Sequence, residues 1–262
     1  MSRTSATYEG VARAWAAGPS RVYDRLADAL VAAYPAPIAG QRVLDVGAGT
    51  GAVSRAVQRR GGIPAAVDAA PDMVAHMRAN GIDAVTGDLL ALPFDDATFD
   101  GAVAAFSVSH VDEPVRALKE MRRVVHPRGV VVVGLFAAAP ANAAKAIVDA
   151  VAERFGYVAP AWYLRLKRDL EPLTNTPELL ADCARRAGLD EVAVAEQVVD
   201  TGVTEPADIV AARIGMAHLA PFVDGLEASR RDAFIAAATA AVAEDPQPLR
   251  PLVLVMSSRV RA

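Results

Sequence analysis

The chain has 262 residues, of which 53% are hydrophobic, and a formal net charge of −4. A chain of this length can bury a large core as a single α/β domain. Charges of both signs are interspersed and form no basic stripe, so we expect no nucleic-acid partner. The single cysteine, Cys183, allows neither an internal disulfide nor a thiolate zinc site, as is typical of a reducing cytoplasm.

Two stretches bear on targeting to a membrane. Residues 1–5 lead into no apolar segment, so we expect no secretory signal. The longest apolar run, residues 130–139, is about half as long as a membrane span requires and predicts a strand that runs into a loop. These observations predict a soluble, cytoplasmic protein with no membrane partner.

The N-terminal region predicts two short helices. Apolar residues recur at spacings of three and four between Tyr8 and Tyr34, and the pattern is interrupted at residues 18–20. We expect the two helices to pack over the edge of a sheet, within a helical cap that comprises residues 1–38.

Short apolar runs then alternate with helix-forming segments through a core at residues 41–136. The expected strands are 43–46, 63–67, 84–87, 99–107 and 130–136, the expected helices are 52–60, 72–80 and 114–125, and a turn is expected at 126–129. This alternation implies right-handed crossovers. It predicts an α/β fold with a doubly wound, mostly parallel sheet and helices on both faces.

The second half of the chain changes character. Its expected elements are a helix over 177–187 that Gly188 ends, strands over 191–199 and 252–260, and helical segments over 206–220 and 226–244. We interpret residues 137–175 and 204–247 as helical insertions that form a substrate lobe. Residues 1–262 are therefore expected to make a single domain with no second one.

Residues 43–51 carry the first chemical signal. An apolar run ends there in glycines at positions 47, 49 and 51, which remove the Cβ atoms that would keep a ligand away from the backbone. The amides at the start of the following helix would point at whatever fills the turn. The alternative is that these glycines serve only the turn's geometry, because a glycine-rich turn alone is weak evidence.

Two carboxylates come at the ends of the next two strands. Asp68 falls about twenty residues after the glycine turn, where a βαβ nucleotide site presents an acid to ribose hydroxyls. Asp88 could accept a hydrogen bond from an adenine amine, with the Leu89 amide available to a ring nitrogen. Either aspartate alone could be a cap or turn residue. Together they favour a cofactor site.

Asp45 and the glycine spacing indicate the charge of that cofactor. The spacing differs from the Gly-x-Gly-x-x-Gly turn that cradles a diphosphate. Asp45 adds a negative charge beside the turn, which disfavours a diphosphate and suits a cationic sulfonium or ammonium. We therefore expect a positively charged cofactor.

These residues resemble the class I S-adenosylmethionine (SAM)-dependent methyltransferase family. The sequence VLDVGAGTG at 43–51 is similar to the family's first motif, and Asp68 to the acidic end of its second strand. Residues 87–100 resemble the block that follows, and 106–111 and 124–129 the later strand regions. The resemblance covers residues 41–136.

The resemblance implies a seven-stranded sheet whose last strand is antiparallel, with SAM as the cofactor. By the same resemblance Asp68 would bind the SAM ribose, and Asp88 and Leu89 would lie at the adenine. Ala69 stands where the family often has a bulkier apolar side chain against adenine, so this contact is either weak or supplied by another residue.

The resemblance also implies contacts with the methionine end of SAM. Gly47 and Gly49 would lie along the methionine portion, and the main chain near Phe106 and Ser107 would approach its amino group.

Methyl transfer is an in-line displacement, so the enzyme mainly aligns the nucleophile and excludes water, and a base is optional. If the acceptor is a hydroxyl or an acidic carbon, a histidine could remove its proton. His110, after the fourth strand, is the first candidate, and His218, in the inserted helices, is the second. For either histidine a packing role is the alternative.

Aromatic residues gather on either side of the αβ alternation, and could line a pocket for an apolar acceptor or belong to the ordinary core. They are Tyr8, Trp15, Tyr23, Tyr157, Trp162, Tyr163 and Phe222. Tyr8 and Tyr23 are the best candidates to lie near the methionine end of the cofactor.

The sequence thus predicts SAM-dependent methyl transfer to an oxygen, nitrogen or carbon of a small, partly apolar metabolite. No metal is expected, because Asp95 and Asp96 sit in a turn that needs no ion. The alternatives are an NAD(P)-dependent oxidoreductase on a related sheet and a non-catalytic SAM-binding protein. The acceptor and the oligomeric state stay open.

Overall fold

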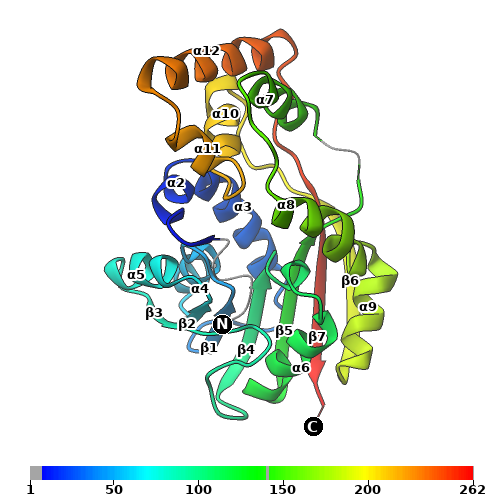
Figure 1. Ribbon diagram of the computed structural model, residues 1–262. Helices are drawn as coiled ribbons and strands as arrows, with labels where there is room; N and C mark the ends of the chain where they lie inside the picture. Colours follow the sequence, from blue (N-terminus) through cyan, green and yellow to red (C-terminus); the bar gives the residue numbers. More distant parts are fainter. Residues whose placement is uncertain (1–7, 140–141, 262) are drawn as a thin grey trace.

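Seven strands form one sheet in the order β3-β2-β1-β4-β5-β7-β6 (Figure 1). The computed structural model describes residues 8–139 and 142–261. Residues 1–7 of the predicted N-terminal cap and 140–141 of the first predicted insertion lie outside the described residues.

The strands are β1 (Arg42–Val46), β2 (Ile63–Asp68), β3 (Asp83–Thr86), β4 (Phe99–Ala105), β5 (Val125–Phe136), β6 (Leu189–Val198) and β7 (Leu252–Val260). Strand β7 pairs antiparallel with both β5 and β6. The pairs formed among β1 to β5 are parallel. The predicted seven-stranded, doubly wound α/β fold is therefore confirmed, including its antiparallel last strand.

The helices of the described chain are α2 (Ala12–Ala17), α3 (Pro19–Ala32), α4 (Ala52–Arg59), α5 (Pro71–Ala79), α6 (Pro114–Val124), α7 (Ala143–Arg154), α8 (Ala161–Arg165), α9 (Pro177–Arg186), α10 (Pro206–Ile214), α11 (Ala220–Asp224) and α12 (Ala228–Glu244). Short turns of other helix types lie at η1 (Val108–His110), η2 (Leu166–Leu170) and η3 (Glu171–Leu173). Five of the helices begin at a proline, whose fixed φ suits the first helical position and whose missing N–H is no loss there.

Helices cover both faces of the sheet, as β1 illustrates. Consecutive strand residues point to opposite faces. Val43 packs in the cluster that includes Leu30 of α3, whereas Leu44 packs in the cluster with Leu118 of α6 and Leu180 of α9. Because both faces are covered, residues 43–46 of the strand are all buried, and Asp45 is the only one of them that is not apolar.

Helix α3 lies over the interior of the sheet, so the prediction that the N-terminal helices pack at its edge is wrong. A Cβ added to Gly134 of β5 would collide with Leu30, and one added to Gly101 of β4 would collide with the Tyr34 ring. These two glycines let the helix and the tyrosine after it rest directly on the central strands β4 and β5.

Two other expectations differ from the structure. Residues 126–129, predicted as a turn before the fifth strand, are an irregularity inside β5: Val125 pairs with Phe99, and the regular register resumes only at Val130. The predicted helical segments over 206–220 and 226–244 are three helices, α10, α11 and α12, with a proline inside α11 where a break was expected.

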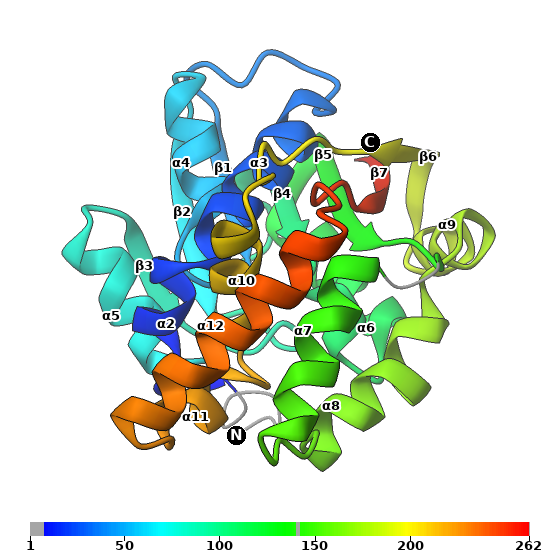
Figure 2. The same ribbon diagram turned by 90° about the horizontal axis from the view of Figure 1, so that it is seen from above.

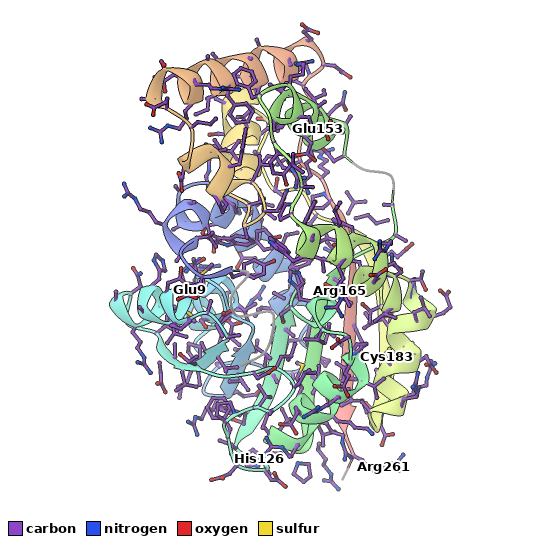
Figure 3. The ribbon with its side chains drawn as sticks, viewed as in Figure 1. Glu9, His126, Glu153, Arg165, Cys183 and Arg261 are labelled. Atoms are coloured by element: carbon purple, nitrogen blue, oxygen red, sulfur yellow. The ribbon has the colours of Figure 1, made fainter. Side chains whose placement is uncertain are left out.

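Helices α7, α10, α11 and α12 gather above the sheet at the top of Figure 1. The same helices lie in front of the sheet when the molecule is seen from above (Figure 2). Figure 3 labels Glu153 on α7 at this end and His126 on β5 at the opposite end. The two predicted insertions supply these helices, and their role as a substrate lobe stays a prediction.

Candidate active site

The glycine turn after β1 has the backbone that its sequence predicts. Gly47 and Gly49 have φ values of 67° and 56°, in the left-handed region. A Cβ at Gly47 would collide with Ser107, whereas the space where a Gly49 Cβ would lie is empty to 4 Å. The Gly47 amide donates to the carbonyl of Val67 at 2.9 Å, which closes the turn onto the end of β2.

Asp68 at the end of β2 ties the glycine turn to α5. Its Oδ2 accepts from the Gly49 amide at 2.7 Å, and its Oδ1 accepts from the Ala70 amide at 2.9 Å. Burial raises the pKa of Asp68, although these two amides oppose the shift. Each carboxylate oxygen can still accept a second hydrogen bond.

Asp45 is almost completely buried, with 1% of its surface exposed. Its Oδ2 accepts from both the amide and the hydroxyl of Ser54, each at 2.8 Å, and so links β1 to the first turn of α4. Burial raises the pKa of Asp45 to about 7, against the effect of the Ser54 hydrogen bonds. Its carboxylate is therefore only partly ionised at neutral pH, and its predicted attraction for a cationic cofactor stays a prediction.

The end of β4 closes against the same turn. The Ser107 hydroxyl donates to the carbonyl of Val46 at 2.7 Å. Phe106 has a φ of 63°, which a residue with a side chain adopts at a cost of about 1 kcal/mol or more. Its ring lies 4.4 Å from that of Phe136 and 5.6 Å from that of Tyr23, measured between centroids.

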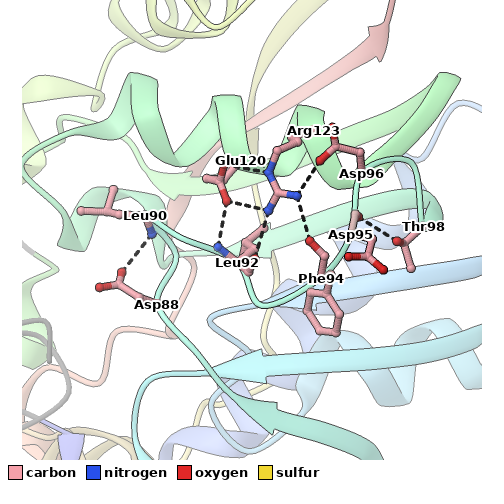
Figure 4. Close-up of polar contacts among 9 residues, drawn as sticks. All are labelled: Asp88, Leu90, Leu92, Phe94, Asp95, Asp96, Thr98, Glu120 and Arg123. Carbon is pink, nitrogen blue, oxygen red and sulfur yellow. Dashed lines mark hydrogen bonds and ion pairs between the residues drawn. The ribbon is translucent and has the colours of Figure 1, made fainter.

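The loop that carries Asp88 and Leu89 is fastened to α6 (Figure 4). Asp88 Oδ1 accepts from the Leu90 amide at 2.9 Å, and Glu120 accepts from the Leu92 amide at 2.9 Å. Arg123 donates to the carbonyls of Leu92 and Phe94 at 3.0 and 2.8 Å, and to the side chains of Asp96 and Glu120.

A first cavity of about 140 Å³ lies between these elements. Every residue predicted to bind the cofactor lines it, and so does His110, the first predicted base: Tyr8, Tyr23, Asp45, Gly47, Gly49, Asp68, Ala69, Asp88, Leu89, Phe106, Ser107 and His110. The reasoning from sequence missed Val67, Met73 and Val111, which also line it. Val67 and Val111 sit inside the motifs, and the buried face of α5 could have indicated Met73.

His110, at the end of η1, is partly buried in the cavity wall. Its Nδ1 lies 3.1 Å from the hydroxyl of Tyr8, and the two ring centroids are 5.6 Å apart. Burial lowers the pKa of His110 to about 4, and Lys167 contributes to the shift. Burial also raises the pKa of Tyr8, so both side chains are uncharged at neutral pH.

A second cavity of about 600 Å³ adjoins the first. The two share Tyr8, Tyr23, Phe106 and His110, which therefore form the junction between them. Among the other predicted pocket aromatics, Trp162 and Tyr163 line the second cavity, and Trp15 lines the first.

Tyr157 and Phe222 line neither of these two cavities. Their ring centroids are 5.5 Å apart, and the Phe222 ring packs 6.1 Å from that of Phe234 in the core. The structure therefore assigns these two rings to the core and not to a pocket.

His218, the second predicted base, lines only the second cavity. Its ring stacks on Tyr163 at 3.8 Å with an interplanar angle of 2°. Burial and the nearby Arg213 lower the pKa of His218 to about 3. Because His218 does not line the first cavity, it is not part of the junction that contains Tyr8 and His110.

Two kinds of feature are absent from residues 8–139 and 142–261. No group of three or more His, Cys, Asp or Glu side chains there is placed to hold a metal ion. None of the helices in these two segments is long and apolar enough to span a bilayer.

Comparison with known proteins places the chain in a family. A methyltransferase-domain family model matches residues 44–133. The chain is 42% identical over 121 residues to a demethylmenaquinone methyltransferase of Renibacterium salmoninarum, which is 45% of this chain and 49% of that protein. It is 32% identical over 166 residues to the demethylmenaquinone methyltransferase of Mycolicibacterium paratuberculosis, which is 62% of this chain and 67% of that protein.

The chain spans about half the length of the first of these relatives. Among solved structures, phosphoethanolamine N-methyltransferase 2 of Haemonchus contortus in complex with SAM shares the fold, with a TM-score of 0.55 and 15% identity. That likeness covers 90% of this chain and 52% of the other.

The fold, the glycine turn and the two strand-end carboxylates define a nucleotide-type cofactor site. The chain belongs to the class I SAM-dependent methyltransferase family. The predicted family and its SAM cofactor are thereby confirmed. The contacts of individual residues with that cofactor remain predictions.

Proposed function

We propose that this protein transfers a methyl group from SAM to an oxygen, nitrogen or carbon of a small, partly apolar metabolite. The observation that carries the proposal is the junction of the two cavities at Tyr8, Tyr23, Phe106 and His110. In-line displacement requires the nucleophile opposite the leaving sulfur, and adjoining cofactor and acceptor cavities provide that alignment. The methyl leaves the sulfonium, S-adenosylhomocysteine (SAH) departs, and the acceptor loses a proton.

In this proposal the cofactor runs along the first cavity from Asp88 to the junction. Asp68 accepts from the ribose hydroxyls with the lone pairs that the Gly49 and Ala70 amides leave unused. Asp88, Leu89 and Ala69 surround the adenine.

The methionine portion of SAM follows the glycine turn. The open space at Gly49 supports this placement, since any side chain there would intrude on the ligand. The main chain at Phe106 and Ser107 approaches the amino group, and Tyr8 and Tyr23 flank the methyl. Asp45 acts indirectly on the cofactor, because its hydrogen bonds to Ser54 hold the glycine turn between β1 and α4 in place.

We propose that His110 removes the acceptor's proton where that acceptor is a hydroxyl or an acidic carbon. A neutral imidazole carries its hydrogen on one nitrogen only. If the Tyr8 hydroxyl accepts from Nδ1–H, the other nitrogen, Nε2, is left free to take a proton. The lowered pKa of His110 keeps the ring in this neutral form.

The relatives' names give demethylmenaquinone as a candidate acceptor. The family model ends at residue 133, however, and most residues that line the second cavity come after it. The acceptor therefore has to be sought from the cavity itself. The family assignment leaves the oxidoreductase alternative without support, and measured methyl transfer would exclude a non-catalytic SAM-binding protein. We place the reaction in the cytoplasm, in keeping with the single buried, unpaired thiol of Cys183.

The test titrates the purified protein with SAM, SAH and NAD by calorimetry, and measures methyl transfer from labelled SAM to aromatic and quinol acceptors. We expect SAM and SAH to bind and NAD not to bind. Asp68→Asn should weaken SAM binding about tenfold or more, because charge-assisted hydrogen bonds contribute about 1.5–3 kcal/mol. The matched control is Asp83→Asn, at the exposed start of β3. A folded Asp68→Asn or Asp68→Ala protein that binds SAM as tightly as the parent would contradict the ribose contact.

A further inference from the structure

The second cavity contains both acidic and basic side chains, and most of them are paired. Arg213 donates to the two oxygens of Asp149 at 2.8 and 2.6 Å. Lys167 donates to the two oxygens of Glu171 at 2.7 and 3.0 Å. These two pairs cancel in charge. Arg250, also on the wall, is paired with Asp200 at 2.7 Å.

Lys145 is the cation of the cavity wall that has no acidic partner within the residues the structure describes. It lies in the first turn of α7, and its Nζ is 5.3 Å from the centroid of the Phe136 ring. Phe136 in turn stacks on Phe106, which lines both cavities. The Phe136 ring therefore lies between Lys145 and the Phe106 ring of the junction. Because Lys145 and the junction line the same cavity, a molecule in it can contact both.

The surroundings of Lys145 oppose its charge. Burial, Arg213 and Lys167 lower the pKa of Lys145 to about 8. Asp149 and Glu171, each already paired with another cation, only partly oppose this shift. The nearby Phe136 ring offers only a weak cation–π contact. An ammonium without a counter-ion is costly in such a site, and an anion that entered the cavity would relieve this cost.

His218 also lines this cavity, but its Nε2 does not face the open space. Only 5% of its surface is exposed, and its Nε2 is buried without a hydrogen-bond partner among the described residues. Burial and the cations Arg213, Lys167 and Lys145 all lower the pKa of this ring, so it is neutral and adds no charge to the cavity wall.

We propose that the methyl acceptor is an aromatic or apolar molecule that carries one carboxylate, and that Lys145 binds this carboxylate. A single unpaired cation matches a monoanion better than a phosphate dianion. The aromatic side chains Trp162, Tyr163 and Phe136 supply apolar wall for the rest of the molecule. The inference rests on the proposed function and narrows its acceptor to a class other than a neutral quinol.

The test compares two probes of nearly equal shape, 2-naphthoate and 2-naphthamide, by calorimetry with the SAH-saturated full-length protein. We expect 2-naphthoate to bind about tenfold or more tightly than the amide, as a charge-assisted hydrogen bond predicts. Lys145→Met should remove this preference while leaving amide binding unchanged, and Lys145→Arg should retain it. Lys119→Met, on the exposed surface of α6, is the matched control and should behave as the parent.

Three results would overturn the inference: equal affinity of the parent for the two probes, no binding of 2-naphthoate, or a preference that survives Lys145→Met. SAH binding of each variant, measured in the same titrations, reports whether it is folded. If Lys145→Met does not fold, the parent and Lys145→Arg still decide between a charge-selective and a charge-indifferent cavity. A parent protein that binds neither SAM nor SAH would instead contradict the proposed function.

Discussion

The contact between Tyr8 and His110 controls which nitrogen of the imidazole can accept a proton. The oxygen and Nδ1 are 3.1 Å apart, and the hydrogen can lie on either atom. If the tyrosine donated, Nε2 would carry the ring hydrogen and could not act as a base. A catalytic role for His110 therefore requires that Tyr8 accept.

His110→Ala should reduce kcat by about a hundredfold, the usual size of a general-base contribution, and should leave SAM affinity close to that of the parent. The parent's kcat should not fall between pH 8 and pH 6, because a base whose pKa is lowered to about 4 stays unprotonated there. We expect kcat to fall only as the pH approaches 4, where His110 becomes protonated. Rates are measured across pH with any acceptor found in the transfer assay.

The control for this substitution is His76→Ala on the partly exposed face of α5, which should not change kcat. The base role is wrong if His110→Ala retains the parent's turnover and pH profile. Tyr8→Phe removes the partner hydroxyl while keeping the ring, so it distinguishes an orienting role for Tyr8 from simple packing.

Among the elements, the loop between β3 and β4 depends on one arginine of α6. Arg123 is bonded to two loop carbonyls and two carboxylates, and so holds residues 92–96 against the helix. The same loop presents Asp88 and Leu89 to the first cavity. The position of the proposed adenine contacts thus depends on a side chain that does not line the cavity.

Arg123→Met should weaken SAM binding by about three- to tenfold, since lost hydrogen bonds of about 1 kcal/mol each loosen the loop without touching the ligand. Amide hydrogen exchange should quicken over residues 88–98. Arg122→Met, the exposed neighbour on the same helix, should change neither quantity. Unchanged exchange in the loop of a folded Arg123→Met protein would contradict this account.

The sequence predicts an element well where the residues that determine it lie within that element or next to it. The last strand, 252–260, has the predicted bounds, and the start of α9 follows from Thr176, whose hydroxyl accepts from the Leu179 amide. The position of α3 over the central strands could not be predicted. It depends on Gly134, where the missing side chain makes room for Leu30 of α3, and this glycine lies about a hundred residues after the helix.

The same distinction applies to the site. Asp68 and Asp88 could be predicted because the carboxyl ends of parallel strands meet at one edge of a sheet. Lys145 could not, because the cavity wall around it is built from separate segments. That it has no acidic partner among the described residues becomes evident only in the folded structure. Sequence motifs therefore indicate the cofactor half of the site better than the acceptor half.

At the scale of the whole molecule, the N-terminal segment, residues 8–17, forms one wall of the first cavity, and the ends of the strands form another. Tyr8 and Trp15 come from before the first strand and line the first cavity. The Ala12 amide donates to Asp72 of α5 at 3.1 Å, which attaches this segment near the end of β2, where the ribose contact is proposed. Occupation of the cavity should therefore order a part of the chain that precedes the sheet.

We expect SAH to slow amide hydrogen exchange over residues 8–17 and 106–111, because both segments contact the first cavity. Helix α9, on the other face of the sheet, serves as the internal control and should be unaffected. Exchange that is slowed only in the glycine turn, with residues 8–17 unchanged, would contradict this role of the N-terminal segment.

The shared wall formed by Tyr8, Tyr23, Phe106 and His110 has a consequence for cooperativity. If the cofactor fixes these side chains in the arrangement that the second ligand meets, binding of the cofactor strengthens binding of the acceptor. Thermodynamic reciprocity then requires that the acceptor strengthen the retention of SAM by the same factor by which SAM strengthens the capture of the acceptor.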